Sequence, residues 1–241
     1  MARKRLDTLV VERGLAETRA KAQALIMAGE VLINGSPAAK PGTLINEDAE
    51  ITVKESLPYV SRGGIKLAHA LDTFQINVSG MVAADIGAST GGFTDCLLQR
   101  GAKRVYAVDV GYGQLDYRLR QDKRVVVMER INARYPVSLP EKVDLATIDL
   151  SFISATKVIP SVVGLLRENG SILVLIKPQF EAKRAEVGKG GIIKDPQVHA
   201  RVLGRFIKWA VEQKLRLKGL VASPILGSSG NREFFLMLNL T

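Results

Sequence analysis

The stretch DIGASTGGFTD at residues 85–95 limits more than any other feature what this chain can fold into. An apolar run at residues 81–84 precedes it and is short enough for a buried parallel strand, and a helical pattern begins at residues 96–98. The stretch is therefore predicted to be a turn that leads from a strand into a helix. Its glycines let the backbone pass close to a ligand, and the helix start offers free N–H groups. These glycines are Gly87, Gly91 and Gly92.

An acidic residue at the end of the next apolar run supports a nucleotide-like ligand. Residues 105–108 end in Asp109, at the place where a nucleotide-binding α/β unit positions the carboxylate that binds ribose hydroxyls. The glycine order is not G-x-G-x-x-G and no Walker lysine follows it, which favours an adenosyl ligand without a pyrophosphate, above all S-adenosylmethionine. The glycine turn is expected near the methionine end, and Asn132 near the adenine. The predicted cofactor-binding residues are Asp85, Gly87, Ser89, Gly91, Gly92, Asp109 and Asn132.

Length and charge narrow the classes of protein. With 241 residues the chain can form one large domain, or a large domain with a small companion. A formal charge of +10 favours a polyanionic partner, nucleic acid before membrane. Residues 1–60 hold eight basic and eight acidic side chains, so the remaining residues, with 26 and 16, carry the whole excess.

The sequence gives no indication of export, of membrane insertion or of a metal site. The single cysteine, Cys96, excludes an intramolecular disulfide framework and fits a reducing cytosol. The only histidines are His69 and His199, so no zinc site and no metal is expected. Neither a secretory signal nor an apolar run of the roughly 18 to 20 residues that a membrane span needs is visible. We therefore expect a cytoplasmic protein.

The first 60 residues predict a small α+β module. Helical spacing of apolar residues is seen at residues 6–10 and 22–26, and residues 31–33 run into Asn34-Gly35, a strong hairpin signal. Basic side chains near these helices fit either a solvated surface or a contact with phosphates. The sequence resembles the small RNA-binding module named after a small-subunit ribosomal protein, and this resemblance implies RNA contacts for Arg3, Lys4, Arg5, Arg19 and Lys21.

The predicted domains are the module at residues 1–54, a linker at 55–60 around Pro58, and a large domain at 61–241. The large domain repeats one arrangement, in which ionisable side chains stand at the ends of apolar runs. Asp149 follows the run at 145–148, and Lys177 follows that at 171–176. Open α/β sheets bind ligands beyond the carboxyl ends of their strands, so both lie where chemistry is expected. A glycine-rich segment at 183–194 is expected to be a mobile loop at the mouth of the site.

Two further residues complete a set of four. Lys66 lies in the first turn of an amphipathic helix, and Glu233 opens the final apolar run at 234–240. Lys66, Asp149, Lys177 and Glu233 match, in order and local setting, the Lys-Asp-Lys-Glu tetrad of ribose 2′-O-methyltransferases. The sequence is similar throughout to the TlyA family, which carries the older name haemolysin A. The stretches that carry the resemblance are 60–66, 85–94, 109–115, 149–154, 177–180 and 229–231 with Glu233.

The resemblance implies a Rossmann-like α/β methyltransferase sheet, mostly parallel with an antiparallel last strand. It also implies S-adenosylmethionine-dependent 2′-O-methylation of a cytidine in ribosomal RNA, of the large subunit and possibly also the small. A ribose hydroxyl is a poor nucleophile, so placement and proton removal are the main tasks. Our hypothesis makes Lys177 the base and has Lys66 orient the hydroxyl and stabilise its developing negative charge. The two acids hold both amines in place.

Three alternatives remain open at this stage. A membrane-damaging haemolysin is suggested by the older family name, but it calls for an export signal or amphipathic membrane segments. A ribosome-assembly factor without catalytic activity would use the RNA module and keep the large domain as a scaffold. An amino-group methyltransferase usually carries Asn/Asp-Pro-Pro-Tyr where this chain has Asp149-Leu-Ser-Phe, which makes it the weakest of the three.

Overall fold

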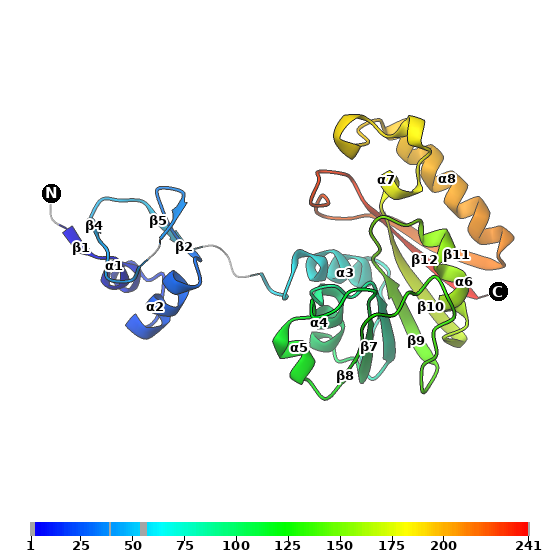
Figure 1. The fold of residues 1–241 in the computed structure, drawn as a ribbon, viewed down its shortest axis with the longest axis horizontal. Coiled ribbons are helices and arrows are strands. Elements are labelled where there is room, and N and C mark those ends of the chain that lie inside the picture. The colour runs from blue at the N-terminus through cyan, green and yellow to red at the C-terminus, as the bar shows by residue number, and fades with distance from the viewer. Residues whose placement is uncertain (1–2, 39, 54–56, 241) are drawn as a thin grey trace. The chain divides into compact units, whose positions relative to one another are not determined.

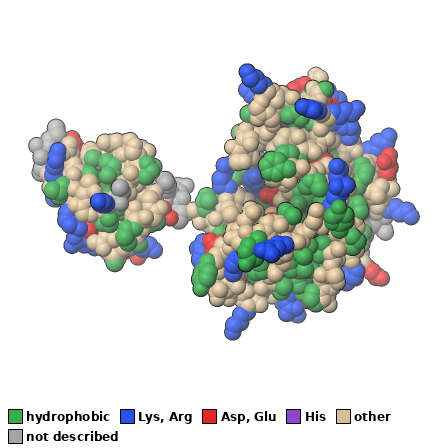
Figure 2. Space-filling model, viewed as in Figure 1, with side chains coloured by type: hydrophobic (Ala, Val, Ile, Leu, Met, Phe, Trp, Pro, Cys, Tyr) green, Lys and Arg blue, Asp and Glu red, His purple; other side chains and the backbone are tan. Residues whose placement is uncertain are grey.

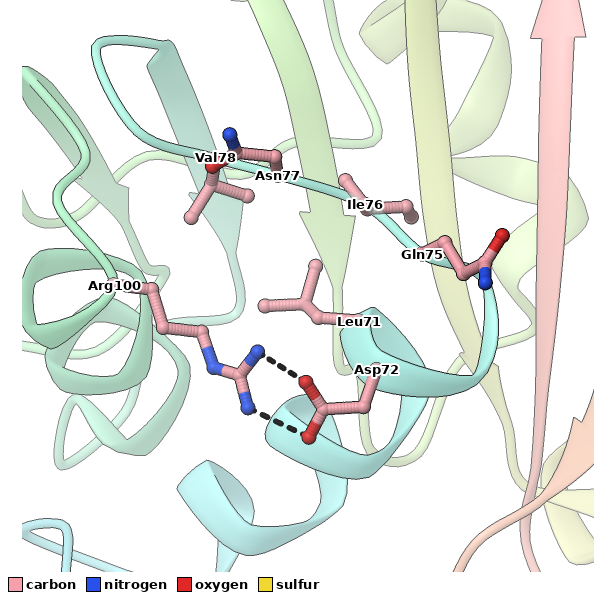
Figure 3. A pocket seen from close by; sticks show the side chains of 7 residues that line it. All are labelled: Leu71, Asp72, Gln75, Ile76, Asn77, Val78 and Arg100. Carbon is pink, nitrogen blue, oxygen red and sulfur yellow. Dashed lines mark hydrogen bonds and ion pairs between the residues drawn. The ribbon is translucent and has the colours of Figure 1, made fainter.

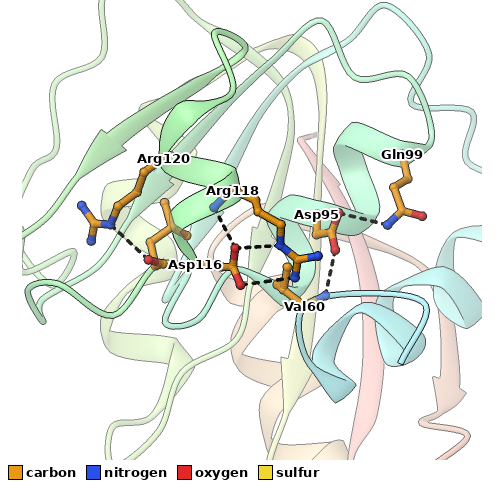
Figure 4. A network of polar contacts seen from close by, with 7 residues as sticks. Val60, Asp95, Gln99, Asp116, Arg118 and Arg120 are labelled. Atoms are coloured by element: carbon orange, nitrogen blue, oxygen red, sulfur yellow. Dashed lines mark hydrogen bonds and ion pairs between the residues drawn. The ribbon is translucent and has the colours of Figure 1, made fainter. Parts of the chain in front are cut away.

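The computed structural model describes residues 3–38, 40–53 and 57–240, and its contacts divide the chain into two compact units, Met1–Leu57 and Pro58–Thr241. Residues 55 and 56 of the predicted linker lie outside the described residues. Residues 58–60, which the sequence placed in the linker, belong to the larger unit and bond to its helix α4 (Gly92–Gln99). The Gln99 side chain donates to the carbonyl of Pro58 (2.9 Å), and the Val60 N–H donates to Asp95 (2.8 Å), as Figure 4 shows for Val60.

Among its described residues, the smaller unit has two helices, α1 (Leu6–Glu12) and α2 (Arg19–Met27). Two short sheets accompany them, one that pairs β1 (Arg3–Arg5) with β4 (Leu44–Asn46) and one in the order β3-β2-β5, formed by Ser36–Pro37, Val31–Ile33 and Ile51–Val53. Asn34 and Gly35 both have positive φ and form the predicted hairpin turn between β2 and β3. Thr18 caps α2 by accepting a hydrogen bond from the Lys21 N–H (3.2 Å).

A seven-stranded sheet in the order β11-β12-β10-β9-β6-β7-β8 forms the centre of the larger unit (Figure 1). Strands β10, β9, β6, β7 and β8 pair in parallel, whereas β12 is antiparallel to both β10 and β11. The predicted fold class, a mostly parallel sheet with an antiparallel last strand, is therefore confirmed. The strands are β6 (Val82–Ile86), β7 (Arg104–Val108), β8 (Val125–Met128), β9 (Val143–Ile148), β10 (Leu166–Ile176), β11 (Leu215–Ala222) and β12 (Phe234–Leu240).

Helices cover both faces of this sheet (Figure 1). One apolar core lies between the sheet and helices α3 (Arg62–Thr73), α4 (Gly92–Gln99) and α5 (Tyr117–Gln121), and the other lies against α6 (Ile159–Val163) and α8 (Pro196–Glu212). Strand residues alternate between the two cores, with Ala83 in the first and Ala84 in the second. Both faces are buried, which explains why the strands are continuous apolar runs in the sequence.

Candidate active site

The predicted site residues gather at one edge of the sheet because parallel strands end on the same side. Gly87 follows β6, Asp109 follows β7, Asp149 follows β9 and Lys177 follows β10. Strands β6 and β9 are neighbours, with Ile86 opposite Ile148, and β9 is in turn the neighbour of β10. The strand order thus places Asp149 between the glycine turn and Lys177.

A cavity of about 500 Å³ opens at this edge. Its volume lies in the range of small-molecule and cofactor sites. Four of the predicted cofactor-binding residues line it, namely Gly87, Ser89, Asp109 and Asn132. Apolar side chains from three loops complete the wall, and they include Val110, Ile131, Leu150 and Ile153.

Backbone N–H groups hold the Asp109 carboxylate in a fixed orientation. One oxygen accepts from the Ser89 N–H (2.8 Å) and the other from the Gly111 N–H (2.7 Å). Each oxygen has a further lone pair for a hydroxyl donor, so the group is preorganised to accept hydrogen bonds from a ribose. Ser89 itself has φ of 48°, a left-handed conformation that is uncommon outside glycine.

Asp85 was predicted as a cofactor ligand, but its side chain lies beneath the turn and does not line the cavity. It is 0% exposed and accepts hydrogen bonds from the hydroxyls of Thr94 (2.7 Å) and Thr147 (3.1 Å). Burial raises the pKa of the Asp85 carboxyl to about 7, although both hydroxyls act in the opposite direction. Through these two hydrogen bonds, Asp85 links the end of β6 to α4 and to β9.

The glycines of the turn are required by close contacts within the protein. A Cβ atom on Gly87 would lie 2.3 Å from the carbonyl oxygen of Asp149, and one on Gly91 would lie 2.2 Å from Leu119. Both residues have positive φ, a backbone conformation that residues other than glycine rarely adopt. A Cβ atom on Gly92 would lie 2.2 Å from the Ser61 hydroxyl. Gly91 does not line the 500 Å³ cavity, so its role in the structure is packing against α5.

The four residues of the predicted tetrad form two ion pairs. Lys66 Nζ lies 2.5 Å from Glu233 Oε2, and these two residues are 8% and 3% exposed. Lys177 Nζ lies 2.6 Å from Asp149 Oδ1 and also donates to the Ser151 hydroxyl (3.1 Å). Charges with so little solvent around them are kept only when they are paired, so each carboxylate fixes the position of one amine.

Two smaller cavities are each lined by residues of both ion pairs. Lys66 and Asp149 line a cavity of about 140 Å³, and Lys177 and Glu233 line another of about 300 Å³. Asp149 also lines the 500 Å³ cavity. Each small cavity thus contains one member of each ion pair. The structure brings together all four residues, which lie far apart in the sequence.

An exposed aromatic residue at the mouth of the site was not among the predicted residues. Phe152 is 91% exposed, has φ of 67°, and lines both the 500 Å³ and the 300 Å³ cavities. Its ring packs against Phe180, with ring centroids 5.3 Å apart. A sequence signal was present, because Phe152 lies three residues after the strand-end carboxylate Asp149 and contributes nothing to the apolar periodicity. Gln114, Arg134, Ser151 and Gln179 also line these cavities and were not predicted.

A shallow groove elsewhere on the larger unit lacks the features of a reaction site. It lies beside the end of α3 and is lined by Leu71, Ile76 and Val78, among others (Figure 3). Its charged groups neutralise each other, since Arg100 binds both oxygens of Asp72 at 2.5 and 2.8 Å. The described residues also include no group of three or more His, Cys, Asp or Glu side chains arranged for a metal ion.

The predicted RNA-binding residues lie in the smaller unit, and three of them make ion pairs within it. Arg5 and Arg19 both bind Asp7, which is completely buried and whose pKa is lowered chiefly by the hydrogen bond from Arg5. Lys4 pairs with Glu12 (3.2 Å), while Arg3 and Lys21 are exposed. Figure 2 shows Lys and Arg side chains over both units on the face in view. Arg5 and Arg19 therefore stabilise the module as well as adding charge to its surface.

Comparison with known families gives the class of protein. The model for FtsJ-like methyltransferases matches residues 59–240, and the model for the S4 domain matches residues 4–51. The fold and the site at its carboxyl edge are thus those of a methyltransferase joined to an S4 domain. None of the helices among the described residues is both long and apolar enough to cross a bilayer.

Individual relatives narrow the class to one family. YqxC of Bacillus subtilis, whose name contains the words rRNA methyltransferase, is 53% identical over 98% of this chain and 86% of its own. The 16S/23S rRNA (cytidine-2′-O)-methyltransferase TlyA of Mycobacterium tuberculosis is 48% identical over 99% of this chain and 91% of its own. Hemolysin A of Brachyspira hyodysenteriae is 43% identical over 95% and 97%. The chain belongs to the TlyA family of FtsJ-like methyltransferases.

A solved structure agrees with this assignment. A protein of Streptococcus thermophilus, whose name carries the word hemolysin, superposes with a TM-score of 0.76 at 46% sequence identity. The match covers 100% of this chain and 90% of the other.

Proposed function

We propose that this protein transfers a methyl group from S-adenosylmethionine to the ribose 2′-hydroxyl of a cytidine in ribosomal RNA, in the cytoplasm. One observation carries the proposal: two lysine–carboxylate pairs meet beside a cofactor-sized cavity at the carboxyl edge of the sheet. The name of the Mycobacterium tuberculosis relative supports cytidine as the target and leaves both ribosomal subunits open. Residues 1–54 bind RNA and residues 61–241 carry the reaction.

The 500 Å³ cavity fits S-adenosylmethionine in size and in the chemistry of its wall. Asp109 binds the ribose hydroxyls, because its carboxylate is already oriented by two N–H groups. Gly87 and Ser89 would hold the methionine end and Asn132 the adenine, for which the apolar wall offers further contact. The bound cofactor supplies an electrophilic methyl group on a positively charged sulfur.

The two ion pairs divide the remaining work. Lys177 in its neutral form accepts the proton of the 2′-hydroxyl, and Asp149 then stabilises the ammonium group across 2.6 Å. Lys66 orients the hydroxyl and stabilises negative charge that develops on its oxygen, while Glu233 holds the Lys66 amine in place. Both amines are fixed before substrate binds, so little reorganisation is needed in the transition state.

The RNA is held at two levels. Side chains of the smaller unit contact phosphates, which position the substrate without reading its sequence. Arg3, Lys4, Arg5, Arg19 and Lys21 are the residues assigned to this contact. At the mouth of the site, Phe152 offers a solvent-exposed ring on which an unstacked base can lie.

Lys177→Arg tests the assignment of the base. Arginine keeps the positive charge but cannot be deprotonated, so transfer of radiolabelled methyl to ribosomal subunits should fall about 100-fold or more. The subunits come from cells that lack the protein, and calorimetry should show unchanged cofactor binding. Lys208→Arg, an exposed lysine on α8, is the control. Turnover by the Lys177→Arg variant close to that of the wild type would refute the role of Lys177.

The same measurements separate the alternatives. A wild-type protein that binds ribosomal subunits but never transfers label would be an assembly factor. Lysis of erythrocytes that persists in Lys177→Ala would instead support a haemolysin.

A further inference from the structure

Lys177 and Asp149 come from neighbouring strands, but the ladder between these strands does not reach them. The pairing of β9 with β10 ends at Ile148 and Val174, and both members of the ion pair lie beyond it. The 2.6 Å between Lys177 Nζ and Asp149 Oδ1 therefore depends on contacts between the two segments that follow the strands. A residue that joins these segments helps to set the geometry of the reaction.

Glu181 joins the two segments through its side chain. Lys177 is the N-cap of α7 (Pro178–Glu181), and Glu181 is the last residue of this short helix. One oxygen of its carboxylate accepts from the Ser154 hydroxyl (2.5 Å), and the other accepts from the Ala155 N–H (2.7 Å). These two hydrogen bonds, together called the Glu181 link, hold the helix that follows β10 to the loop that follows β9.

The loop side of the Glu181 link is a fixed point of the fold. Ala155 is 4% exposed and lies in the same apolar core as Val158. A residue packed in a core cannot shift without losing contacts. Ser154 is held as well, because its hydroxyl accepts from the Thr156 N–H (3.2 Å). Since α7 is little more than one helical turn, fixing its last residue also fixes Lys177 at its start.

The hydrogen bonds of Glu181, and not its charge, account for its place. Burial raises the pKa of the Glu181 carboxyl, and the hydrogen bonds from Ser154 and Ala155 act in the opposite direction. The surroundings thus disfavour the negative charge, whereas both oxygens are used as acceptors. Glu181 is also absent from the residues that line the three cavities of the site, so it acts through Lys177 and not on the reacting groups.

We propose that Glu181 is a positioning residue that holds Lys177 at the distance from Asp149 that methyl transfer requires; this inference rests on the proposed function. With the Glu181 link intact, Lys177 Nζ also lies 3.1 Å from the Ser151 hydroxyl, at the wall of the 300 Å³ cavity. Without the link, α7 turns away from the loop and the base no longer meets the 2′-hydroxyl at bonding distance. A displacement of about 1 Å can lower a reaction rate about 100-fold.

The test measures kcat, KM and cofactor binding in variants of Glu181. Methyl transfer to ribosomal subunits from cells that lack the protein is counted per cofactor-binding site, which calorimetry determines. Glu181→Ala removes both acceptors, so kcat should fall about 10- to 100-fold, while the KM for subunits and the Kd for S-adenosylmethionine change less than about threefold.

The conservative variant separates the hydrogen bonds of Glu181 from its charge. Glu181→Gln should keep kcat within about threefold of the wild type, because an amide offers one acceptor and one donor. Its oxygen accepts from the Ala155 N–H and its nitrogen donates to the Ser154 hydroxyl. That hydroxyl can turn its own hydrogen toward Thr156 Oγ1, which lies 2.7 Å away.

Two more variants provide a control and a second test. Asp144 also joins neighbouring segments, since it accepts from the Val82 N–H (2.8 Å) and from Arg167 (2.5 Å), but it lies at the opposite edge of the sheet. Asp144→Ala should therefore leave kcat per site unchanged. Ser154→Ala removes half of the Glu181 link and should lower kcat about threefold or more, without further effect when Glu181→Ala is already present. It tests the proposal even where Glu181→Ala does not fold.

Any of four outcomes overturns the positioning role of Glu181. They are a kcat of Glu181→Ala and Ser154→Ala close to that of the wild type, a loss in KM or Kd in place of kcat, a Glu181→Gln variant as impaired as Glu181→Ala, and an equal loss of kcat in Asp144→Ala. The third would show that the charge acts in the reaction, and the fourth that any loosening of the sheet slows transfer. A wild type that transfers no methyl to the subunits overturns the proposed function itself.

Discussion

Replacing Asp85 by asparagine should make the larger unit more stable near neutral pH. The carboxylate is completely buried beneath the glycine turn, and its negative charge is opposed by burial and by the nearby charge of Asp149. Asparagine has the same shape and keeps one acceptor for Thr94. The Thr147 hydroxyl, which also lies 3.5 Å from the carbonyl of Ala84, can donate there and accept from the new amide. The variant therefore removes the charge and leaves the packing intact.

The pKa of Asp85 sets the size and the sign of the effect. Its folded-state value of about 7 lies above the usual 3.8, so between these values the native state binds more protons than the unfolded chain. Stability is then highest at acidic pH and falls as the pH rises through this interval. The interval spans about 3 pH units, each worth about 1.4 kcal/mol, which amounts to a loss of about 4 kcal/mol.

Urea unfolding at a series of pH values between 4 and 8 measures this loss. Trp209 is the only tryptophan of the chain and lies in α8, so its fluorescence reports on the larger unit alone. The free energy of unfolding of the wild type minus that of Asp85→Asn should fall by about 4 kcal/mol from pH 4 to pH 8, because titrations common to both proteins cancel. A difference that stays flat across this range would refute the assignment of a charged, buried Asp85.

Three further predictions concern other parts of the molecule. Gly87→Ala should lower the melting temperature by about 4–8 °C, equivalent to about 2 kcal/mol, because its Cβ atom would clash with the Asp149 carbonyl. Gly80 has a similar φ and no neighbour within 4 Å, so Gly80→Ala should lower the melting temperature clearly less. Equal shifts in the two variants would argue against the clash. Asp109→Ala should weaken S-adenosylmethionine binding about 10- to 100-fold by calorimetry, and an unchanged Kd would place the ribose elsewhere. Asp7→Ala should destabilise the smaller unit by about 1–3 kcal/mol, which faster proteolysis of this unit would reveal. Because the hydrogen bonds from Arg5 and Arg19 lower the pKa of Asp7, the wild type should lose the same contribution only in acid, below about pH 4. Unchanged proteolysis of the variant would show that the ion pairs of Asp7 with Arg5 and Arg19 do not stabilise the unit.

The sequence predicts well which residues lie at the carboxyl edge of the sheet, because parallel strands all end on the same side. Apolar runs that end in Asp109, Asp149 and Lys177 are visible locally, and the geometry of parallel strands then brings their ends together. The glycine turn was also predicted, but its cause was not. Contacts of Gly87 and Gly91 with residues far along the chain exclude a side chain there, and such contacts leave no periodic pattern.

Side-chain partners account for most of what the sequence could not predict. Asp85 and Asp109 both end apolar runs, and only the three-dimensional neighbours show that one faces down into the protein and the other toward the cavity. The segment at 183–194 looked unstructured because its glycines and charges are typical of loops. The Asn231 amide that anchors it belongs to a distant turn.

The Lys66–Glu233 pair joins residues 167 positions apart, and Glu233 directly precedes β12, which is inserted between β10 and β11. During synthesis, Lys66 leaves the ribosome long before its carboxylate partner exists, and β10 lacks a neighbour on one side until β12 arrives. Contacts of such long sequence separation form late in folding. The Lys66–Glu233 pair therefore forms only after nearly the whole of the larger unit has been synthesised and β12 has found its place between β10 and β11.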